Sequence, residues 1–210
     1  LDCPVEKTMV TPNGIQEERF RNLPGKTKED EGRINIGAVL RVTPIKDVKT
    51  MIQAFGFAWE REPSLKLWIM GPWEEDQEYA RECFELVETL GLKDVVFTGR
   101  IDVREYLGRM DMTILTSISE GQPLTILEGF EAMVKLGRET NLRLQMGENG
   151  YHRLMARYRV EFMQDTYWHI YRDFAESCGV PFEEDPVRLP IVKGQTKEEA
   201  VLEENRTQDK

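Results

Sequence analysis

The sequence lacks long apolar runs, and this absence excludes a membrane-spanning helix. Its strongest apolar runs, at 34–40 and 65–70, are far shorter than the ~18 consecutive residues that such a helix requires. Positive charge is also scarce, because 28 Lys and Arg stand against 38 Asp and Glu and leave a formal charge of -10. This charge disfavours binding of nucleic acid or an anionic membrane, so any phosphate must be bound by a local group of cations.

Cysteine and histidine are few, and neither forms a metal-binding pattern. Cys3, Cys83 and Cys178 are odd in number and far apart, so they fit neither a disulfide framework nor a zinc site. His152 and His169 are more typical of ordinary helix positions than of metal ligands. The cysteine usage fits a reducing cytoplasm. The N-terminus has no basic or apolar leader and no initiator Met, so we interpret the chain as a fragment.

Apolar runs alternate with helical patterns along the chain and predict an α/β fold. The 210 residues, 40% of them hydrophobic, suffice for one domain with a sizeable core. Strands are predicted at 34–40, 65–70, 95–98 and 112–115, and helices at 48–59, 79–90, 102–109 and from about Pro123. This order predicts a parallel sheet with helices on both faces. In such folds, ligands bind beyond the carboxyl ends of the strands.

The two ends of the chain differ from this alternating centre. Residues 1–33 are predicted to form an entry and linker, and 21–33 is expected to be polar and exposed, since Pro24-Gly25 and a charged run precede the first strand. Beyond about residue 138 the apolar residues recur at helical intervals and predict one or two packing helices, which complete a domain at 34–178. Mixed charge and weak periodicity predict that 179–210 form a charged tail.

The turn after the first strand carries two cations. Arg41 and Lys46 are five residues apart and can reach one diphosphate from two sides. The turn has no G-x-G-x-x-G pattern, which argues against an NAD enzyme. A solvated basic turn would have the same composition, so diphosphate binding depends on what the neighbouring segments provide.

The segment 116–130, TSISEGQPLTILEGF, carries the most information about function. Pro123 suits a first helical position, where free backbone amides attract phosphate. Glu120 and Glu128 lie about two helical turns apart, so both carboxylates can face one cleft and accept hydrogen bonds from sugar or ribose hydroxyls. Two Glu at this spacing also occur by chance in a Glu-rich chain, so only the complete segment supports a site.

These segments together resemble the C-terminal, donor-binding half of a retaining GT-B glycosyltransferase of family 4. The matching pieces are Val10-Thr11-Pro12-Asn13-Gly14-Ile15, the turn 41–46, Ile69-Met70-Gly71-Pro72, Val96-Phe97-Thr98-Gly99-Arg100 and the E-x7-E motif from Glu120 to Glu128. The resemblance covers 10–132 strongly and 139–174 loosely. It is greatest to the type that builds the Pel exopolysaccharide from UDP-glucose, and it implies a Rossmann-like domain.

The resemblance implies a role for each site residue. Arg41 and Lys46 would bind the donor diphosphate and, with Glu120 on the hexose hydroxyls, form the catalytic group. Glu128 would bind the ribose hydroxyls. The other donor-binding positions would be Gly99 and Arg100 beside the base and Gly121, Gln122 and Leu124 beside the sugar or phosphate. We expect no metal, no cofactor and no conventional general base, because the cations would stabilise the leaving nucleoside diphosphate.

The resemblance also implies a cytoplasmic hexosyltransferase that uses a nucleoside diphosphate sugar, with UDP-glucose as the expected donor, in polysaccharide synthesis. The family's acceptor domain would precede Val10, and we expect the chain without that domain to be inactive. Further partners would be a second copy of the chain or the exopolysaccharide synthesis machinery. The alternatives are a non-catalytic nucleotide-binding or assembly module, and a phosphorylase-like enzyme or epimerase of the same fold.

After Ala132 the sequence departs from the family pattern. The family continues with two more strands, whereas 133–138 runs directly into the helical end of this chain. We therefore expect the last two strands to be absent and the fourth strand to become a sheet edge. We expect a covering segment from 133–146, or another chain, to shield this edge.

Overall fold

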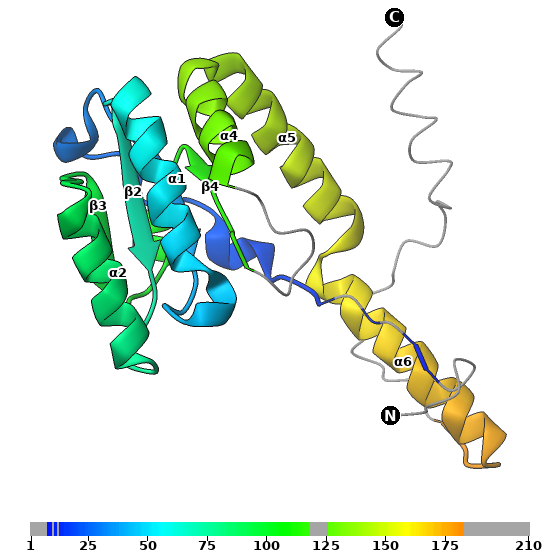
Figure 1. The fold of residues 1–210 in the computed structure, drawn as a ribbon. Helices are drawn as coiled ribbons and strands as arrows, with labels where there is room; N and C mark the ends of the chain where they lie inside the picture. The colour runs from blue at the N-terminus through cyan, green and yellow to red at the C-terminus, as the bar shows by residue number, and fades with distance from the viewer. Residues whose placement is uncertain (1–7, 10, 12, 118–125, 183–210) are drawn as a thin grey trace, which may run out of the picture. The chain divides into compact units, whose positions relative to one another are not determined.

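Residues 8–9, 11, 13–117 and 126–182 are described by a computed structural model, with the side chains of 126–130 left out. Contacts divide the chain into two compact units, Leu1–Gln164 and Asp165–Lys210. The first unit holds a sheet with its covering helices (Figure 1). Among the described residues of the second unit, the Trp168 ring packs edge-on against Phe182, with centroids 5.4 Å apart.

Four parallel strands form the sheet and confirm the predicted α/β class. They are β1 (Ile34–Val39), β2 (Leu65–Met70), β3 (Val95–Gly99) and β4 (Met112–Thr113). Their order is β3-β2-β1-β4, with β1 and β2 paired over their whole length. Every neighbouring pair in this order is parallel, so the carboxyl ends of the strands meet at one edge (Figure 1).

Helix α1 (Val48–Arg61) lies at the centre of the helical layer on one face of the sheet. One face of the helix is apolar at helical spacing and buried, and its buried residues are Val48, Met51, Ile52, Ala54, Phe55 and Ala58. Helices α2 (Gln77–Thr89) and α4 (Ile126–Arg138) pack on either side of it (Figure 1). The core therefore lies between this layer and the alternate residues Leu65, Leu67 and Ile69 of β2.

The opposite face of the sheet is covered by the short helix α3 (Arg104–Leu107). Trp68 alternates with Leu67 and Ile69 along β2, so its ring lies on this second face. The rings of Trp68 and Tyr106 are 5.9 Å apart, and the Arg109 guanidinium lies 4.7 Å from the Trp68 ring. Helices therefore cover both faces, as the alternating pattern predicted.

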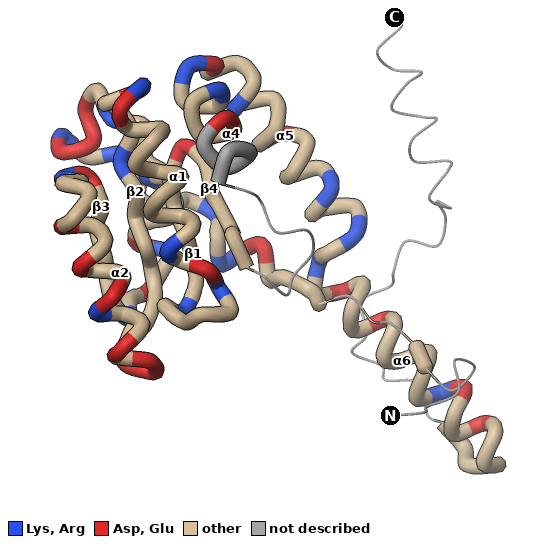
Figure 2. Tube along the Cα trace, in the orientation of Figure 1, with Lys and Arg blue, Asp and Glu red and all other residues tan. Residues whose placement is uncertain are grey.

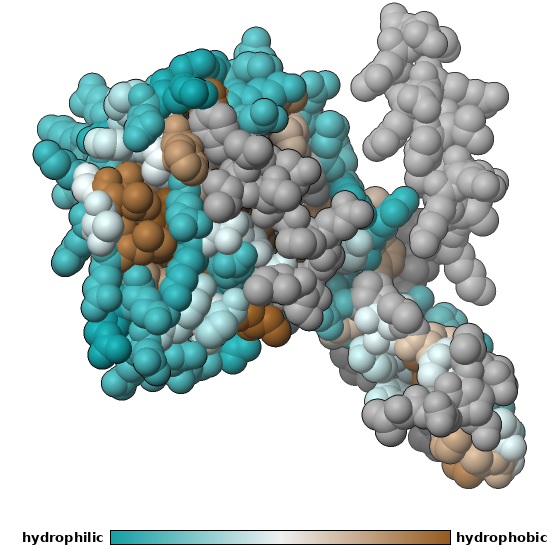
Figure 3. All heavy atoms as spheres, in the orientation of Figure 1, coloured by the Kyte–Doolittle hydropathy of each residue, from teal (hydrophilic) through white to brown (hydrophobic). Residues whose placement is uncertain are grey.

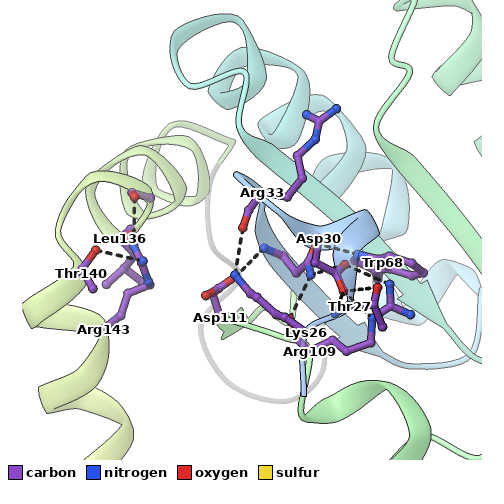
Figure 4. Close-up of polar contacts among 12 residues, drawn as sticks. Lys26, Thr27, Asp30, Arg33, Trp68, Arg109, Asp111, Leu136, Thr140 and Arg143 are labelled. Atoms are coloured by element: carbon purple, nitrogen blue, oxygen red, sulfur yellow. Dashed lines mark hydrogen bonds and ion pairs between the residues drawn. The ribbon is translucent and has the colours of Figure 1, made fainter. Parts of the chain in front are cut away.

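The end of the predicted linker is packed into the domain. The preceding short 3-10 helices are η2 (Glu17–Phe20) and η3 (Lys28–Asp30). Most of 21–33 is exposed, as expected, but Asp30 is 1% exposed and accepts two hydrogen bonds from Arg109, of 2.8 and 2.9 Å (Figure 4). The Asn35 side chain joins Asp30 to the Trp68 indole. The expectation of an exposed linker is therefore wrong at Asp30, because its carboxylate pairs with a residue 79 positions away.

Lys26 attaches the same linker to the first and last strands of the sheet. Its ammonium lies 2.6 Å from Asp111 Oδ2, and that oxygen also accepts a hydrogen bond from the backbone amide of Asn35 (Figure 4). Asp111 immediately precedes β4, and Asn35 lies in β1. The polar contacts of Lys26 and Asp30 thus fix the chain at the amino ends of these two strands.

The helical end of the sequence forms α5 (Thr140–Arg157) and α6 (Val160–Ser177), which confirms two helices. Arg143 donates hydrogen bonds to the carbonyls of Leu136 and Gly137 and so caps α4 (Figure 4). Neither helix has a described residue in the buried class, although both carry apolar side chains such as Leu144 and Phe174. The described residues of these two helices are therefore half-buried at most, although α5 packs against α4 and the start of α6 lies against Gly14.

Strand β4 is shorter than the predicted strand at 112–115, and it lies at the sheet edge. It pairs with β1 through Met112 and Thr113, and the described residues contain no strand on its other side. The predicted cover includes Met133, which is 2% exposed and belongs to the core beside α1 rather than to a fifth strand. What shields the free edge of β4 stays a prediction.

Charge is distributed unevenly over the surface of the domain. Acidic residues lie in the loop before α2 and along α2 itself, whereas most of the charged residues of α5 are basic (Figure 2).

Within the described ranges, none of the helices combines the length and apolar character that crossing a membrane would require.

Candidate functional site

Three loops are joined by hydrogen bonds at the carboxyl edge of the sheet. The backbone amide of Leu40, just after β1, donates to the Met70 carbonyl at 3.0 Å, and that of Val42 donates to the Pro72 carbonyl at 2.9 Å. The Thr116 hydroxyl, after β4, bonds to the carbonyls of Lys46 and Asp47 at 2.9 and 3.0 Å. The loop after β1 is therefore held by the loops that follow β2 and β4, on either side of it in the sheet order.

Gly71 allows the closest of these approaches. Its φ is +151°, and a Cβ built on it would lie 1.9 Å from the Leu40 carbonyl oxygen. Gly71 also forms a bridge with Gly99 at the end of β3. At Gly99, φ is +71° and a Cβ would lie 3.1 Å from the Trp73 ring. Both positive φ values, and the close neighbours at both positions, favour glycine over a residue with a side chain.

Arg41 is exposed at this edge and forms an ion pair with Glu75. Its Nη1 atom lies 3.0 Å from Glu75 Oε2, and the two side chains are 58% and 42% exposed. An ion pair in such solvent contact contributes only about 0–1 kcal/mol to stability. Arg41 can therefore exchange Glu75 for an anionic ligand at little cost. Sequence reasoning missed Glu75, although the acidic run Glu74-Glu75-Asp76 after β2 was a visible signal.

Lys46 is half-buried at the end of the short helix η4 (Pro44–Lys46). The amides of Lys46 and Asp47 donate to the carbonyls of Thr43 and Pro44, each at 3.0 Å. Asp47 has a φ of +47°, a left-handed conformation that Asp tolerates better than most residues. This sharp change of direction places Lys46 immediately before α1.

Two hydroxyls in these loops are buried without a protein partner. Thr43 Oγ1 and Ser117 Oγ have no hydrogen bond to any residue that the structure describes. Thr43 belongs to the Lys46 turn, and Ser117 follows Thr116 in sequence. Buried hydroxyls are normally paired, so these two leave capacity for water or for polar atoms of a ligand.

Five of the predicted site residues cannot be placed through their side chains. Glu120, Gly121, Gln122 and Leu124 lie outside the described residues. Glu128 lies in α4, which packs against α1, but its side chain is not described. Of the predicted positions that are described, Arg41 and Lys46 lie after β1, whereas Gly99 ends β3 and Arg100 is exposed beside it. The roles that the resemblance implies for all of these residues stay predictions.

A cavity of about 300 Å³ lies elsewhere on the domain. Its lining is mostly apolar and comes from the last turns of α1 and from the end of α2 with the following loop, including Phe57, Trp59, Leu90 and Leu92. An apolar patch is visible there (Figure 3). Lys46 precedes the first turn of α1, so this cavity lies at the other end of that helix and has no cation suited to a diphosphate.

Burial keeps two side chains among the described residues, Cys83 and Tyr79, in their protonated forms. Burial raises the pKa of the Cys83 thiol to about 11 and that of the Tyr79 hydroxyl to about 12, so both stay protonated at neutral pH. Glu17, Glu18 and Glu161 place carboxylate oxygens within 4.8 Å of one another. The Arg159 guanidinium lies beside these carboxylates, with its Nε atom 3.0 Å from Glu17 Oε1. A cation therefore already offsets part of their charge.

Comparison with known proteins adds a family to this geometry. A protein-family model described as "Glycosyl transferases group 1" matches residues 19–136. An alpha-monoglucosyldiacylglycerol synthase of Streptococcus pneumoniae is 30% identical over 118 residues, which make up 54% of this chain and 26% of that protein. The chain thus spans about a quarter of the length of this curated relative.

Solved structures share the fold at low sequence identity. A glycosyltransferase of Rickettsia africae has a TM-score of 0.72 at 15% identity, over 81% of this chain and 58% of its own. HepE of Anabaena, in complex with UDP and glucose, has a TM-score of 0.67 at 15% identity, over 85% and 58%. The C-terminal domain of LpcC, a glycosyl transferase group 1 family protein of Francisella tularensis, has a TM-score of 0.56 at 16% identity, over 71% and 96%. At these identities the likeness concerns the fold.

Proposed function

The chain belongs to the glycosyl transferases group 1 family, and from this premise we propose that it is the donor-binding part of a retaining family 4 hexosyltransferase. Its donor would be UDP-glucose, and the product a polysaccharide made in the cytoplasm, as in Pel exopolysaccharide synthesis. Two related proteins support glucose: HepE, which was solved with UDP and glucose, and the synthase whose name describes a glucosylated lipid.

The observation that carries this proposal is the arrangement of cations at the carboxyl edge. Arg41 is exposed there, and the turn that bears Lys46 is bonded to Thr116 at the start of the 116–130 segment. A nucleotide diphosphate at this edge would be close to two cations and to the predicted E-x7-E segment. Thr43 and Ser117 have hydroxyls that water or polar ligand atoms could satisfy.

In the proposed reaction, Arg41 and Lys46 bind the diphosphate and stabilise the negative charge of the leaving UDP. The bond between the sugar C1 and the phosphate oxygen breaks, and its electron pair stays on that oxygen. The acceptor hydroxyl forms the new bond to C1 on the face that UDP leaves, and its proton passes to a phosphate oxygen of UDP. Glu128 binds the ribose and Glu120 the hexose, so none of these side chains acts as a general base.

The acceptor would be bound by a second domain, of the kind that precedes the donor-binding half in the family. The solved structures that share the fold extend well beyond the matched region, since this chain covers only 58% of the Rickettsia and Anabaena proteins. We therefore expect donor binding from the chain alone and glucosyl transfer only when the acceptor domain is supplied.

Calorimetric titration of the chain with UDP and UDP-glucose tests the proposal. Lys46→Ala and Glu128→Ala should each weaken binding about 10- to 100-fold, because each removes a charged hydrogen bond worth about 1.5–3 kcal/mol. Lys93→Ala and Glu131→Ala are matched controls, because both residues are exposed and have no role in the proposed site. Wild-type chain that binds neither ligand would favour the non-catalytic assembly module, and equal affinities of all four variants would exclude this donor site.

A further inference from the structure

Thr116 connects the end of the fourth strand to the turn that bears Lys46. Its side-chain oxygen lies 2.9 Å from the Lys46 carbonyl and 3.0 Å from the Asp47 carbonyl, although Lys46 is 70 residues away in sequence. Thr116 is 3% exposed, so water has little access to these hydrogen bonds. From this geometry we propose that Thr116 is a positioning residue that holds Lys46 in place for the donor diphosphate. The proposal rests on the proposed function of Lys46.

The Lys46 turn needs such support because little of its own structure fixes it. It is a 3-10 helix of three residues, and Pro44 and Ile45 face solvent. Asp47 is in a left-handed conformation, and its side chain does not cap α1. Short 3-10 helices have poor hydrogen-bond geometry, and a left-handed residue other than glycine adds strain. A buried contact to the sheet therefore favours this conformation over others.

The chemistry of threonine suits this contact. A hydroxyl has one proton to donate, and here the two carbonyls share it. Valine has nearly the same shape but cannot donate, so Thr116→Val would leave both carbonyls without this donor. Serine keeps the hydroxyl and loses only a methyl group. Comparison of the two variants therefore separates the hydrogen bond from the packing.

Loss of the hydrogen bond should weaken nucleotide binding through Lys46. We expect Thr116→Val to bind UDP about 3- to 10-fold more weakly than wild type, consistent with one neutral hydrogen bond, and Thr116→Ser to stay within about 2-fold. Thr113→Val is the matched control, because Thr113 is exposed on the same strand segment and has no place in the site. It should bind UDP like wild type.

A double-mutant cycle with Lys46→Ala identifies the route of the effect. If Thr116 acts by placing Lys46, Thr116→Val should change the affinity for UDP little once Lys46 has been replaced. Hydrogen exchange in peptides that cover 43–48 gives a readout without ligand. Exchange there should be faster in Thr116→Val than in wild type or Thr113→Val, with less change in the rest of the sheet.

The outcomes separate this inference from the proposed function. If Lys46→Ala weakens UDP binding but Thr116→Val does not, the donor site stands and the positioning role is wrong. An equal effect of Thr116→Val with and without Lys46 also overturns it. If Lys46→Ala binds UDP like wild type, both proposals fail. Should Thr116→Val not fold, Thr116→Cys, with a weaker donor of similar size, replaces it and should show the same effects to a smaller degree.

Discussion

The ion pairs at the two ends of the strands differ in burial. We call these two ends of the sheet its amino edge and its carboxyl edge. At the amino edge, Asp30 and Arg109 form a two-point ion pair with side chains that are 0% and 12% exposed. At the carboxyl edge, Arg41 and Glu75 form a single contact between side chains that are about half exposed. Charges at the amino edge therefore contribute to the fold, whereas those at the carboxyl edge can change partners. A binding site needs the second arrangement, because its cations must leave one anion for another.

The difference follows from the cost of removing charge from water. A buried carboxylate is stable only when its partners replace its hydration, and Asp30 has such partners in Arg109, Asn35 and Thr27. An exposed pair is hydrated before and after it forms, so it is worth little. Burial, more than the number of charges, therefore separates the structural edge from the candidate binding edge.

Removing Asp30 should produce the largest effect on stability. Asp30→Ala leaves the Arg109 guanidinium buried without its main partner, which typically costs about 3–5 kcal/mol. Urea unfolding followed by circular dichroism measures the loss. The matched control is Glu31→Ala, because Glu31 is the neighbouring residue and is exposed. A loss below about 1 kcal/mol for Asp30→Ala would show that the two edges do not differ in this way.

The pH dependence of stability should show the same contrast with a smaller effect. The hydrogen bonds from Arg109, opposed by burial, hold the pKa of Asp30 far below its ordinary value of 3.8. The unfolded state therefore takes up a proton at higher pH than the folded state, and this part of the stability is lost as the pH falls below about 4. Urea unfolding measured from about pH 6 down to about pH 2 should give a steeper decline in stability for wild type than for Asp30→Ala. Parallel declines would contradict the assignment.

Replacing Glu75 should have the smallest effect on stability. Glu75→Ala removes a solvent-exposed partner of Arg41, so we expect a change within about 1 kcal/mol in the free energy of unfolding. The same substitution should raise the affinity for UDP, because loss of a carboxylate next to Arg41 removes a competitor of the diphosphate. An increase of about 2- to 5-fold in affinity is expected. Weaker UDP binding in calorimetry, with unchanged binding by Glu78→Ala, would contradict the exchange of partners.

Local sequence patterns predicted the elements of the fold better than their packing. Alternating strands and helices gave the α/β class, and the helical spacing from Val48 to Ala58 located α1 and its buried face. The same kind of spacing predicted packing for the helices after residue 138, where Leu144 and Phe174 are exposed instead. Periodicity indicates that a face is apolar, but it does not say which surface covers that face.

The candidate site was predictable where it depends on position along a strand. The carboxyl end of a parallel strand is a ligand-binding position in this class of fold, so the turn from Arg41 to Lys46 could be singled out from the sequence. The contacts themselves could not: the acidic run at 74–76 is visible in the sequence, but the pairing of Glu75 with Arg41 and the bond from Thr116 to the Lys46 turn are not. The first contact joins residues that are 34 positions apart in the sequence, and the second joins residues that are 70 apart. Taken alone in a sequence pattern, a glutamate and a threonine do not indicate such partners.

The sequence by itself determined the order of strands and helices, the acidic balance and the presence of two cations after the first strand. Only the tertiary structure decided that Asp30 is buried beside Arg109, that Gly71 meets the Leu40 carbonyl and that Thr116 bonds to the Lys46 turn. The physical reason is one of range. Backbone preferences and hydrophobic periodicity act over a few residues, whereas burial and hydrogen bonding depend on which distant segments the packed sheet brings together.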